Sequence, residues 1–405
     1  MKPIVRAGRM KPVHSDIRGP LFVEAMKRQK QGIDILKLNT GNPATFGFGL
    51  PDSIKNALME HMQDGVGYCD FKGMPQARQA ICDYETIKGI KGITPDDVFI
   101  GNGVSEVVSF ALTPLLNDGD EVLVPSPSYS LWGNSVYLED GKPVFYTCDE
   151  QANWYPDIQD IRSKITDKTK AIVIINPNNP TGVLYPKELL LEIIQIARES
   201  GLLIFADEIY DRLVMDGKQH ISLASLTEDV PVITLNGLSK SHCLCGYRCG
   251  WMVISGPREL TEDYKQGIIQ LTSLRLCANT MAQIVIPAAL DDMETPASMV
   301  RPGGRIYEQR EATVRELEKI DGLSFVKNDA AFYVFPKLDV KKFNITNDKQ
   351  FAHDLLDATN ILLVPGSGFD WKDPDHFRIV MLPQADILSD AIRRMGTFLD
   401  GYKQK

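Results

Sequence analysis

The chain has 405 residues, which is long for one hydrophobic core and predicts two domains, or one large domain with a smaller one attached. With 43% hydrophobic and 24% charged residues, the composition is that of an ordinary globular protein. The 53 acidic residues outnumber the 44 basic ones, and the formal charge of −9 argues against general binding to nucleic acids or anionic membranes, because both recruit basic surfaces.

From residue 97 to residue 254, short β-branched runs alternate with helical patterns. Amphipathic stretches such as PKELLLEIIQIARESG (186–201) begin with a proline and end with a glycine, as helices do. This alternation predicts an α/β fold, with a buried and mostly parallel sheet covered by helices on both faces. The strand candidates are DVFI (97–100), EVLV (121–124), PVFYT (143–147), AIVII (171–175), LLIFA (202–206), VITL (232–235) and WMVIS (251–255).

The last hundred residues have a different pattern, in which helical stretches are mixed with short strand-like pieces such as AFYVFPK and HFRIVML. This mixture predicts a smaller α+β domain over residues 291–405, next to a large domain over residues 46–290. Residues 1–45 carry no sheet pattern of their own, so we expect them to pack with the small domain or against a neighbouring subunit.

Polar side chains follow several of the predicted strands, at the edge where open α/β sheets bind ligands. GNGVSE (101–106) leads into a helical pattern that starts at Val104. Glycines before a helix N-terminus suit an anion, although a simple turn is an equal alternative. The motif lacks the third glycine of a dinucleotide-binding fingerprint and the Gly-Lys-Ser/Thr of a P-loop.

The next strand ends bring aromatic and amide side chains to the same edge. Tyr129 and Trp132 follow EVLV, and each is either a core residue or a stacking platform for a flat ligand. NPNNPTG (176–182) follows AIVII and combines a rigid loop with three asparagines that offer neutral hydrogen-bonding groups.

Two charged residues complete the set. Asp207 comes directly after LLIFA, where it is either an N-cap or a carboxylate that needs a cation in the cleft, because an unpaired buried charge is costly. Lys240 follows VITL, with Arg248 eight residues later. A lysine in a desolvated or cationic setting forms a Schiff base with an aldehyde, whereas a lone lysine in a loop is usually a solvated surface group.

Pyridoxal phosphate uses all these groups together: an aldehyde for the lysine, a phosphate for the helix N-terminus and arginine, and a flat ring for the tyrosine. Its phenolic oxygen takes an amide or hydroxyl donor, and its ring nitrogen takes the carboxylate. In combination, NPNNPTG, FADEIY, LSK and GYRCGW resemble the class I aminotransferases of pyridoxal-phosphate fold type I. Over nearly its full length the chain is similar to the bacterial alanine (glutamate–pyruvate) aminotransferases.

The resemblance implies a role for each matching residue. Lys240 carries the Schiff base and later acts as acid–base in the proton shift, while Asp207 pairs with the ring nitrogen. Tyr129 stacks on the ring, and Asn179 and Tyr210 hydrogen-bond its phenolic oxygen. The residues implied for the phosphate are Val104, Ser105, Ser239 and Arg248, with Tyr68 reaching across from the other subunit of a homodimer.

For the substrate, the resemblance implies that Arg378 of HFRIVML grips the α-carboxylate by a two-point contact, the alternative being a strand-edge arginine. Gly41 lies where substrate approaches the backbone, beside Asn179. Arg18 falls in a segment that is similar to the mobile N-terminal lid of alanine-specific members. Gly237 departs from the family, which often has a phosphate-binding serine there, and Ala330 departs from its usual glycine.

The cysteines and histidines suggest no metal site. Cys243, Cys245 and Cys249 have no second cluster and do not match common zinc spacings, and the six histidines are scattered, with His242 expected to pack or hydrogen-bond locally. Seven cysteines without a disulfide framework predict a reduced, cytoplasmic setting. No apolar run approaches the roughly 18 residues of a membrane span, and the basic N-terminus lacks the hydrophobic stretch of a signal peptide.

The leading functional hypothesis is a ping-pong aminotransferase acting between L-alanine and 2-oxoglutarate. An aminotransferase of aspartate, valine–pyruvate or aromatic specificity stays open, as does a β-lyase or cyclopropane-forming synthase of the same fold, because the core motifs are shared. A non-enzymatic ligand sensor and a nicotinamide enzyme are weaker alternatives, since the reactive residues are intact and the dinucleotide fingerprint is incomplete.

Overall fold

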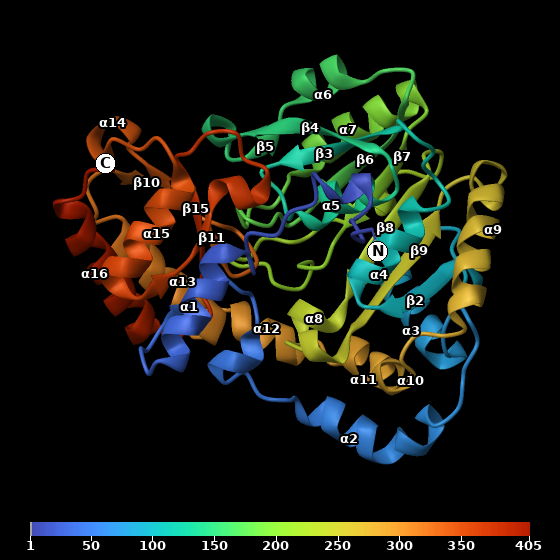
Figure 1. Cartoon of the computed structure of the whole chain (residues 1–405). Helices are drawn as coiled ribbons and strands as arrows, with labels where there is room; N and C mark the ends of the chain where they lie inside the picture. The colour runs from blue at the N-terminus through green and yellow to red at the C-terminus, as the bar shows by residue number, and fades with distance from the viewer. Residues whose placement is uncertain (1) are drawn as a thin grey trace.

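The computed structural model describes residues 2–405 and is built around an eight-stranded sheet in the order β2-β9-β8-β7-β6-β3-β4-β5 (Figure 1). All seven expected strands are present, and the predicted α/β fold with its mostly parallel sheet is confirmed. β9 runs antiparallel to both of its neighbours, and a short β5 pairs antiparallel with β4; neither feature was visible in the sequence pattern. The strands are β2 (Val98–Asn102), β3 (Glu121–Ser126), β4 (Lys142–Asp149), β5 (Tyr155–Pro156), β6 (Thr169–Ile175), β7 (Leu203–Asp207), β8 (Val232–Gly237) and β9 (Cys249–Ser255).

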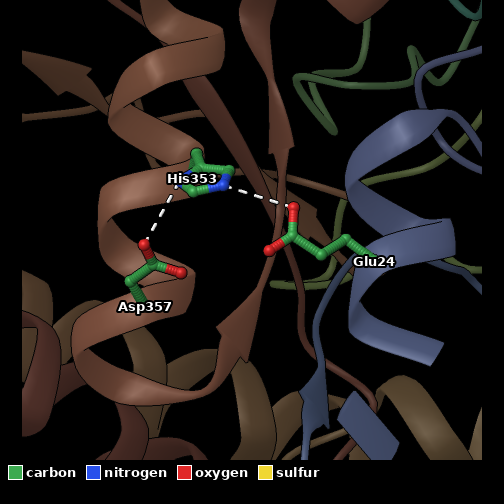
Figure 2. Close-up of side chains that lie close together, drawn as sticks. All are labelled: Glu24, His353 and Asp357. Atoms are coloured by element: carbon green, nitrogen blue, oxygen red, sulfur yellow. Dashed lines mark ion pairs between the residues drawn. The ribbon is translucent and has the colours of Figure 1, made fainter. Parts of the chain in front are cut away.

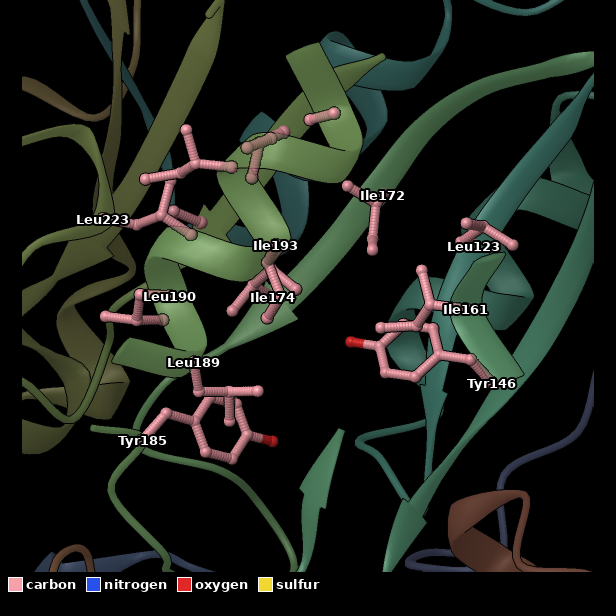
Figure 3. Packing of buried hydrophobic residues seen from close by; sticks show 14 of the residues in the cluster. Leu123, Tyr146, Ile161, Ile172, Ile174, Tyr185, Leu189, Leu190, Ile193 and Leu223 are labelled. Carbon is pink, nitrogen blue, oxygen red and sulfur yellow. The ribbon is translucent and has the colours of Figure 1, made fainter. Parts of the chain in front are cut away.

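Side chains alternate along each strand between two covered faces, which is why the strands are apolar throughout. In β7, Leu203 and Phe205 pack with α4 (Val104–Leu112), α5 (Leu131–Leu138) and α9 (Arg258–Arg275). Ile204 and Ala206 face the opposite layer, formed by α6 (Ile158–Lys164) and α7 (Lys187–Ser200); Figure 3 shows this layer packed on β3, β4 and β6. Both helical layers are therefore as predicted, although α7 begins one residue after Pro186, which is its N-cap.

A third group of helices packs on the β2–β9 end of the sheet. It consists of α2 (Asp52–His61), α3 (Pro75–Ile87), α10 (Thr280–Ile284) and α11 (Ile286–Asp291). α8 (Leu238–Ser241) is a single turn that directly follows β8 and also contributes to this core.

The C-terminal elements enclose a hydrophobic core of their own, on the left in Figure 1. A three-stranded sheet has β15 (Phe377–Val380) in the middle, between β11 (Tyr333–Val334) and β14 (Val364–Pro365). The remaining elements are the pair β10 (Leu323–Ser324) and β12 (Lys337–Leu338), and the helices α12 (Glu294–Val300), α13 (Arg305–Leu317), α14 (Val340–Phe343), α15 (Asp348–Thr359) and α16 (Ala385–Asp400).

The N-terminal segment joins this C-terminal group. β1 (Leu36–Lys37), a two-residue strand too short to show in the sequence, pairs in parallel with β13 (Ile361–Leu362). α1 (Pro20–Lys30) is linked to α15 by His353, whose ring nitrogens lie 3.2 Å from Glu24 and 3.4 Å from Asp357 (Figure 2). Arg28 pairs with the same two carboxylates. Within residues 2–405, no helix combines the length and apolar character needed to cross a bilayer.

A buried charge network fixes the ends of two central strands. Lys88, directly after α3, places its ammonium 2.7 Å from Glu208, 2.9 Å from Glu85 and 3.1 Å from Asp211, all with buried side chains. Asp211 also accepts a 2.7 Å hydrogen bond from Asn236 of β8, while Glu208 directly follows β7. One ammonium therefore bridges three buried carboxylates, two of which, Glu208 and Asp211, lie between β7 and β8.

We predict that Lys88→Met lowers the free energy of unfolding by about 3 kcal/mol, because removing one partner leaves buried carboxylates without a counter-charge. Urea denaturation at neutral pH measures this difference. Lys91→Met is the matched control, since Lys91 is exposed and pairs only with the exposed Glu228, and it should leave the free energy unchanged. Equal stability of the two variants would contradict the role of Lys88.

Candidate active site

The central feature of the site is a buried carboxylate without a cationic partner. Asp207 ends β7 two residues after Phe205, so its side chain points to the same face of the sheet, which α5 covers. There Trp132 of α5 donates to its Oδ2 at 3.1 Å, and the backbone N–H of Ile209 lies 3.4 Å from Oδ1. Asp207 is 5% exposed and makes no ion pair within residues 2–405. A turn follows it rather than a helix, so its side chain does not serve as an N-cap.

Burial raises the pKa of Asp207 to about 6, because a low-dielectric setting disfavours its charged form. The hydrogen bonds from Trp132 and Ile209 and the charge of Lys240 lower this pKa in part, while the neighbouring Glu208 raises it. The site therefore carries a carboxylate whose charge is stabilised once a cation binds beside it.

Lys240 lies on the single turn of α8, next to this carboxylate. Its Nζ donates to the backbone carbonyl of Gly41 at 3.2 Å and lies 5.8 Å from the centre of the Phe332 ring. The lysine is half-buried, so it is not the solvated loop residue of the alternative interpretation.

Arg378 provides a second buried charge, held by neutral groups. It lies in the middle strand β15, not at a sheet edge, and is 1% exposed. Nη1 donates to Asn179 Oδ1 at 2.9 Å, and Nη2 donates to the Asn39 carbonyl. The guanidinium carbon lies 4.5 Å from the centre of the Tyr333 ring and 4.6 Å from that of Phe369, and Nε is buried without an acceptor.

Two buried tyrosines, Tyr210 and Tyr333, lie close to Arg378. The Tyr210 and Tyr333 hydroxyls are 2.9 Å apart, and burial raises the pKa of Tyr210 well above its usual value. Gly41 lies against this pair, because an added Cβ would collide with the Tyr333 hydroxyl. Tyr129, after β3, is half-buried and lies near Arg378. Burial lowers the pKa of the Arg378 guanidinium, and the nearby Tyr129 hydroxyl acts in the opposite direction.

The N-terminus of α4 forms a cradle for an anion. Gly103 precedes it with φ of +85°, and a Cβ at Gly103 would collide with the Arg248 guanidinium. A Cβ at Gly250 would likewise collide with the backbone N–H of Val104. Ser105 is exposed in the first turn of α4, and Ser239 is buried beside Lys240.

The two departures from the family have local causes. A Cβ at Gly237 would lie 2.6 Å from the Cys249 carbonyl, so this backbone has no room for a serine. Ala330 donates its backbone N–H to the Gly182 carbonyl at 2.9 Å, and the positive φ of +59° falls on the next residue, Ala331. An alanine therefore fits at position 330.

Tyr68 and Arg18 are expected site residues that lie on exposed loops. Tyr68 is 84% exposed in a loop that lines a surface hollow with residues 277–280. Arg18 is exposed in the turn before α1.

The cysteines and histidines form separate local contacts. Within residues 2–405 all seven cysteines are free; Cys243 and Cys249 are buried, and Cys245 donates to Asn42 at 3.1 Å. His242 bonds Ser241 and the Asp292 carbonyl, as expected for a local packing residue. The two groups of possible metal ligands, Glu24/His353/Asp357 and Glu208/Asp211/His220, already hold the side-chain cations of Arg28 and Lys88.

Two residues of the site were not assigned from the sequence. Trp132 was expected to be a core residue or a stacking platform, and the structure shows that it is buried and donates to Asp207. Tyr333 was missed, because strand alternation would direct only one of the neighbouring Phe332 and Tyr333 into the site. In the structure both side chains lie against Gly41, and their ring centres are 4.8 Å apart.

These groups fit pyridoxal phosphate. Asp207 lacks a cation where a protonated ring nitrogen needs a carboxylate, and Lys240 offers an amine beside it. The glycine-lined cradle at α4 and Arg248 suit a phosphate. The buried Arg378, with an unused donor, suits a carboxylate.

We predict that Asp207→Asn stabilises the cofactor-free protein at pH 8 by about 3 kcal/mol, because a raised pKa is a stability cost once the carboxyl is ionised. Since the folded pKa lies above the unfolded one, the stability contributed by the protonated form is lost as the pH rises through 6. The advantage of the variant should therefore shrink as the pH falls from 6 towards 4. Urea denaturation of both proteins at several pH values tests this, and a difference independent of pH would contradict it.

Comparison with known proteins agrees with this geometry. Residues 33–392 match the family described as aminotransferase class I and II. The chain is 50% identical to the glutamate–pyruvate aminotransferase AlaA of Haemophilus influenzae and 47% identical to that of Escherichia coli, with each chain covered completely. It matches a crystal structure of an Escherichia coli aminotransferase with a TM-score of 0.98 and 47% identity over both whole chains. An alanine aminotransferase from Pyrococcus furiosus matches with a TM-score of 0.92 and 40% identity, over 98% of this chain and 100% of that one. The chain therefore belongs to the class I and II aminotransferase family.

Proposed function

We propose that this protein is a pyridoxal-phosphate-dependent aminotransferase that moves an amino group between L-alanine and 2-oxoglutarate by a ping-pong mechanism. The observation that carries the proposal is the buried, cation-free Asp207 beside Lys240. The choice of alanine is supported by relatives at 45 to 50% identity over the whole chain, which are named as glutamate–pyruvate or alanine aminotransferases.

Each part of the cofactor would have its own partner in the site. Val104, Ser105, Ser239 and Arg248 would hold its phosphate, Tyr129 would stack on its ring, and Asn179 and Tyr210 would donate to its phenolic oxygen. Asp207 would pair with its ring nitrogen, and Lys240 would carry it as a Schiff base. When bound, the cofactor accepts the amino group of one substrate and passes it to the next.

The chain's own groups then bind the substrate and move its proton. Arg378 binds the α-carboxylate, and its orientation is fixed by Asn179 and the Asn39 carbonyl. Lys240 Nζ, placed at the Gly41 carbonyl, takes the proton from the substrate Cα as a base and then gives it up as the acid of the 1,3-proton shift. Gly41 lets the substrate approach the backbone, and the Phe332 and Tyr333 rings wall this position, as a small side chain requires. Arg18, exposed before α1, would cover the bound substrate.

We further propose that the chain forms two domains, over residues 46–290 and 291–405, and that residues 1–45 pack on the second domain. The separate core of the C-terminal elements and the pairing of β1 with β13 support this division. A cytoplasmic location remains the expectation from the sequence.

We also propose a homodimer in which Tyr68 completes the phosphate site of the neighbouring subunit. Tyr68 is 84% exposed and the nearby Val66 is 76% exposed, so this loop offers an apolar surface to a second subunit.

The first test is a single half-reaction. L-alanine added without a keto acid should bleach the visible band of the cofactor-loaded protein and release one pyruvate per site. Lys240→Ala should lower turnover by about 10³-fold or more, because it removes the acid–base group. Lys187→Ala, on an exposed residue of α7, is the control and should react normally.

Other outcomes of this half-reaction identify the alternatives. A band that bleaches only with aspartate, valine or an aromatic amino acid would keep the family and replace the substrate. Release of ammonia without any acceptor would indicate a β-lyase. A protein that binds no pyridoxal phosphate would refute the proposal.

The shared site is tested by mixing subunits. Tyr68→Ala and Lys240→Ala homodimers should both be impaired. Hybrid dimers, co-expressed with two affinity tags, should regain about half of the normal activity, because one of the two sites then has both residues. Hybrids no more active than the parents would show that Tyr68 does not act across the interface.

A further inference from the structure

Tyr333 contacts two groups of the proposed site, the Tyr210 hydroxyl and the Arg378 guanidinium. Its hydroxyl lies 2.9 Å from that of Tyr210, and its ring centre lies 4.5 Å from the guanidinium carbon of Arg378. Nothing in the sequence pattern assigned it a role.

The backbone fixes this tyrosine to the strand that carries the arginine. Tyr333 pairs with Val380 between β11 and β15, and Met381 donates to the Phe332 carbonyl at 2.9 Å. Ala331 is held at φ of +59° and donates to the Leu213 carbonyl at 2.8 Å. A non-glycine residue in this conformation costs free energy, so the surrounding structure must impose it. The two residues that follow, Phe332 and Tyr333, both lie against Gly41, where an added Cβ would meet each side chain.

The direction of the hydroxyl pair follows from the groups around it. Two hydroxyls at 2.9 Å share one hydrogen, so one of them donates and the other accepts. The guanidinium of Arg378 lies over the Tyr333 ring and has only donors, so it cannot accept the hydroxyl hydrogen. Tyr210 is the neighbour that accepts it, which leaves the hydrogen of Tyr210 free for another acceptor.

We propose that Tyr333 is a positioning residue, which donates its hydroxyl hydrogen to Tyr210 and thereby directs the Tyr210 hydroxyl at the phenolic oxygen of the cofactor. The inference rests on the proposed function. The raised pKa of Tyr210 is consistent with it, since that hydroxyl stays protonated and able to donate.

The test is a pH titration of the visible absorbance of the cofactor-loaded protein, which needs no turnover. Tyr210→Phe removes a donor that stabilises the anionic phenolic oxygen, so the midpoint should rise. Tyr333→Phe should raise it in the same direction, by up to about one pH unit for one hydrogen bond. The double variant should shift no further than Tyr210→Phe alone, because both changes act through one bond.

A matched control removes a buried hydroxyl elsewhere. Tyr146 is fully buried and donates to the Val173 carbonyl at 2.7 Å within the sheet (Figure 3 shows this tyrosine). Tyr146→Phe should leave the midpoint unchanged. A second readout is the dissociation constant of propionate, a carboxylate without an amino group, which Tyr333→Phe should change by less than about twofold because the ring stacked on Arg378 is kept.

Each result decides the question. An unmoved midpoint in Tyr333→Phe, or additive shifts in the double variant, would overturn the inference. So would a large loss of propionate affinity with no spectral shift, which would place the role of the hydroxyl at Arg378. If Tyr333→Phe does not fold, Gly41→Ala, which displaces the same hydroxyl from the other side, must raise the midpoint instead. A wild-type protein without a cofactor band would refute the proposed function itself, and the inference with it.

Discussion

The site depends on one constraint, which is that a carboxylate is held in the middle of the sheet without a cation. β7 has three sheet strands on one side and four on the other, so Asp207 at its end is shielded from water by its neighbours. Burial alone would favour the neutral acid, and the hydrogen bond from Trp132 limits that effect. The consequence is a carboxylate that gains free energy when a cation arrives, which is what a protonated pyridine nitrogen provides.

Glu208, the residue after Asp207, is a buried carboxylate that does have a cationic partner. Glu208 points to the other face of the sheet and receives the Lys88 ammonium, the Ser222 hydroxyl and the Leu223 N–H. Asp207 and Glu208 are consecutive and point to opposite faces of the sheet, so they have different roles. Glu208 is paired with a lysine within the fold, and Asp207 is left for a ligand. Lys88 also pairs with Asp211, which accepts a hydrogen bond from Asn236 of β8, so this network joins the ends of the strands that carry Asp207 and Lys240.

The parts that the sequence predicted are those determined by local pattern. Apolar runs of four or five residues located all seven strands, and polar residues at their ends located Asp207, Lys240 and the NPNNPTG loop, in which the family resemblance selected Asn179. The reversed direction of β9 was not predictable, because a buried strand is apolar in either direction. β1 and β5 have two residues each, which is too short for a period to appear.

The position of Tyr333 was hidden for a different reason: strand alternation would direct only one of Phe332 and Tyr333 into the site, whereas both contact Gly41, which is distant in the chain. Arg378 was assigned through the family resemblance, and its acceptors Asn39 and Asn179 lie 339 and 199 residues away. Such pairings arise only when the N-terminal segment, the large sheet and β15 come together.

The two most buried arginines separate structural from functional charge. Arg310 is bound by both oxygens of Asp216 at 2.7 and 2.6 Å and also lies 2.9 Å from Glu311, so its charge is neutralised within the chain. Arg378 makes no ion pair within residues 2–405; amide and carbonyl oxygens and two aromatic rings surround it instead. A carboxylate from the protein would hold Arg378 more firmly, but it would compete with the substrate for the same donors. Dipoles fix the direction of the guanidinium and leave its charge available, and the same reasoning explains why Trp132, and not a lysine or arginine, is the partner of Asp207.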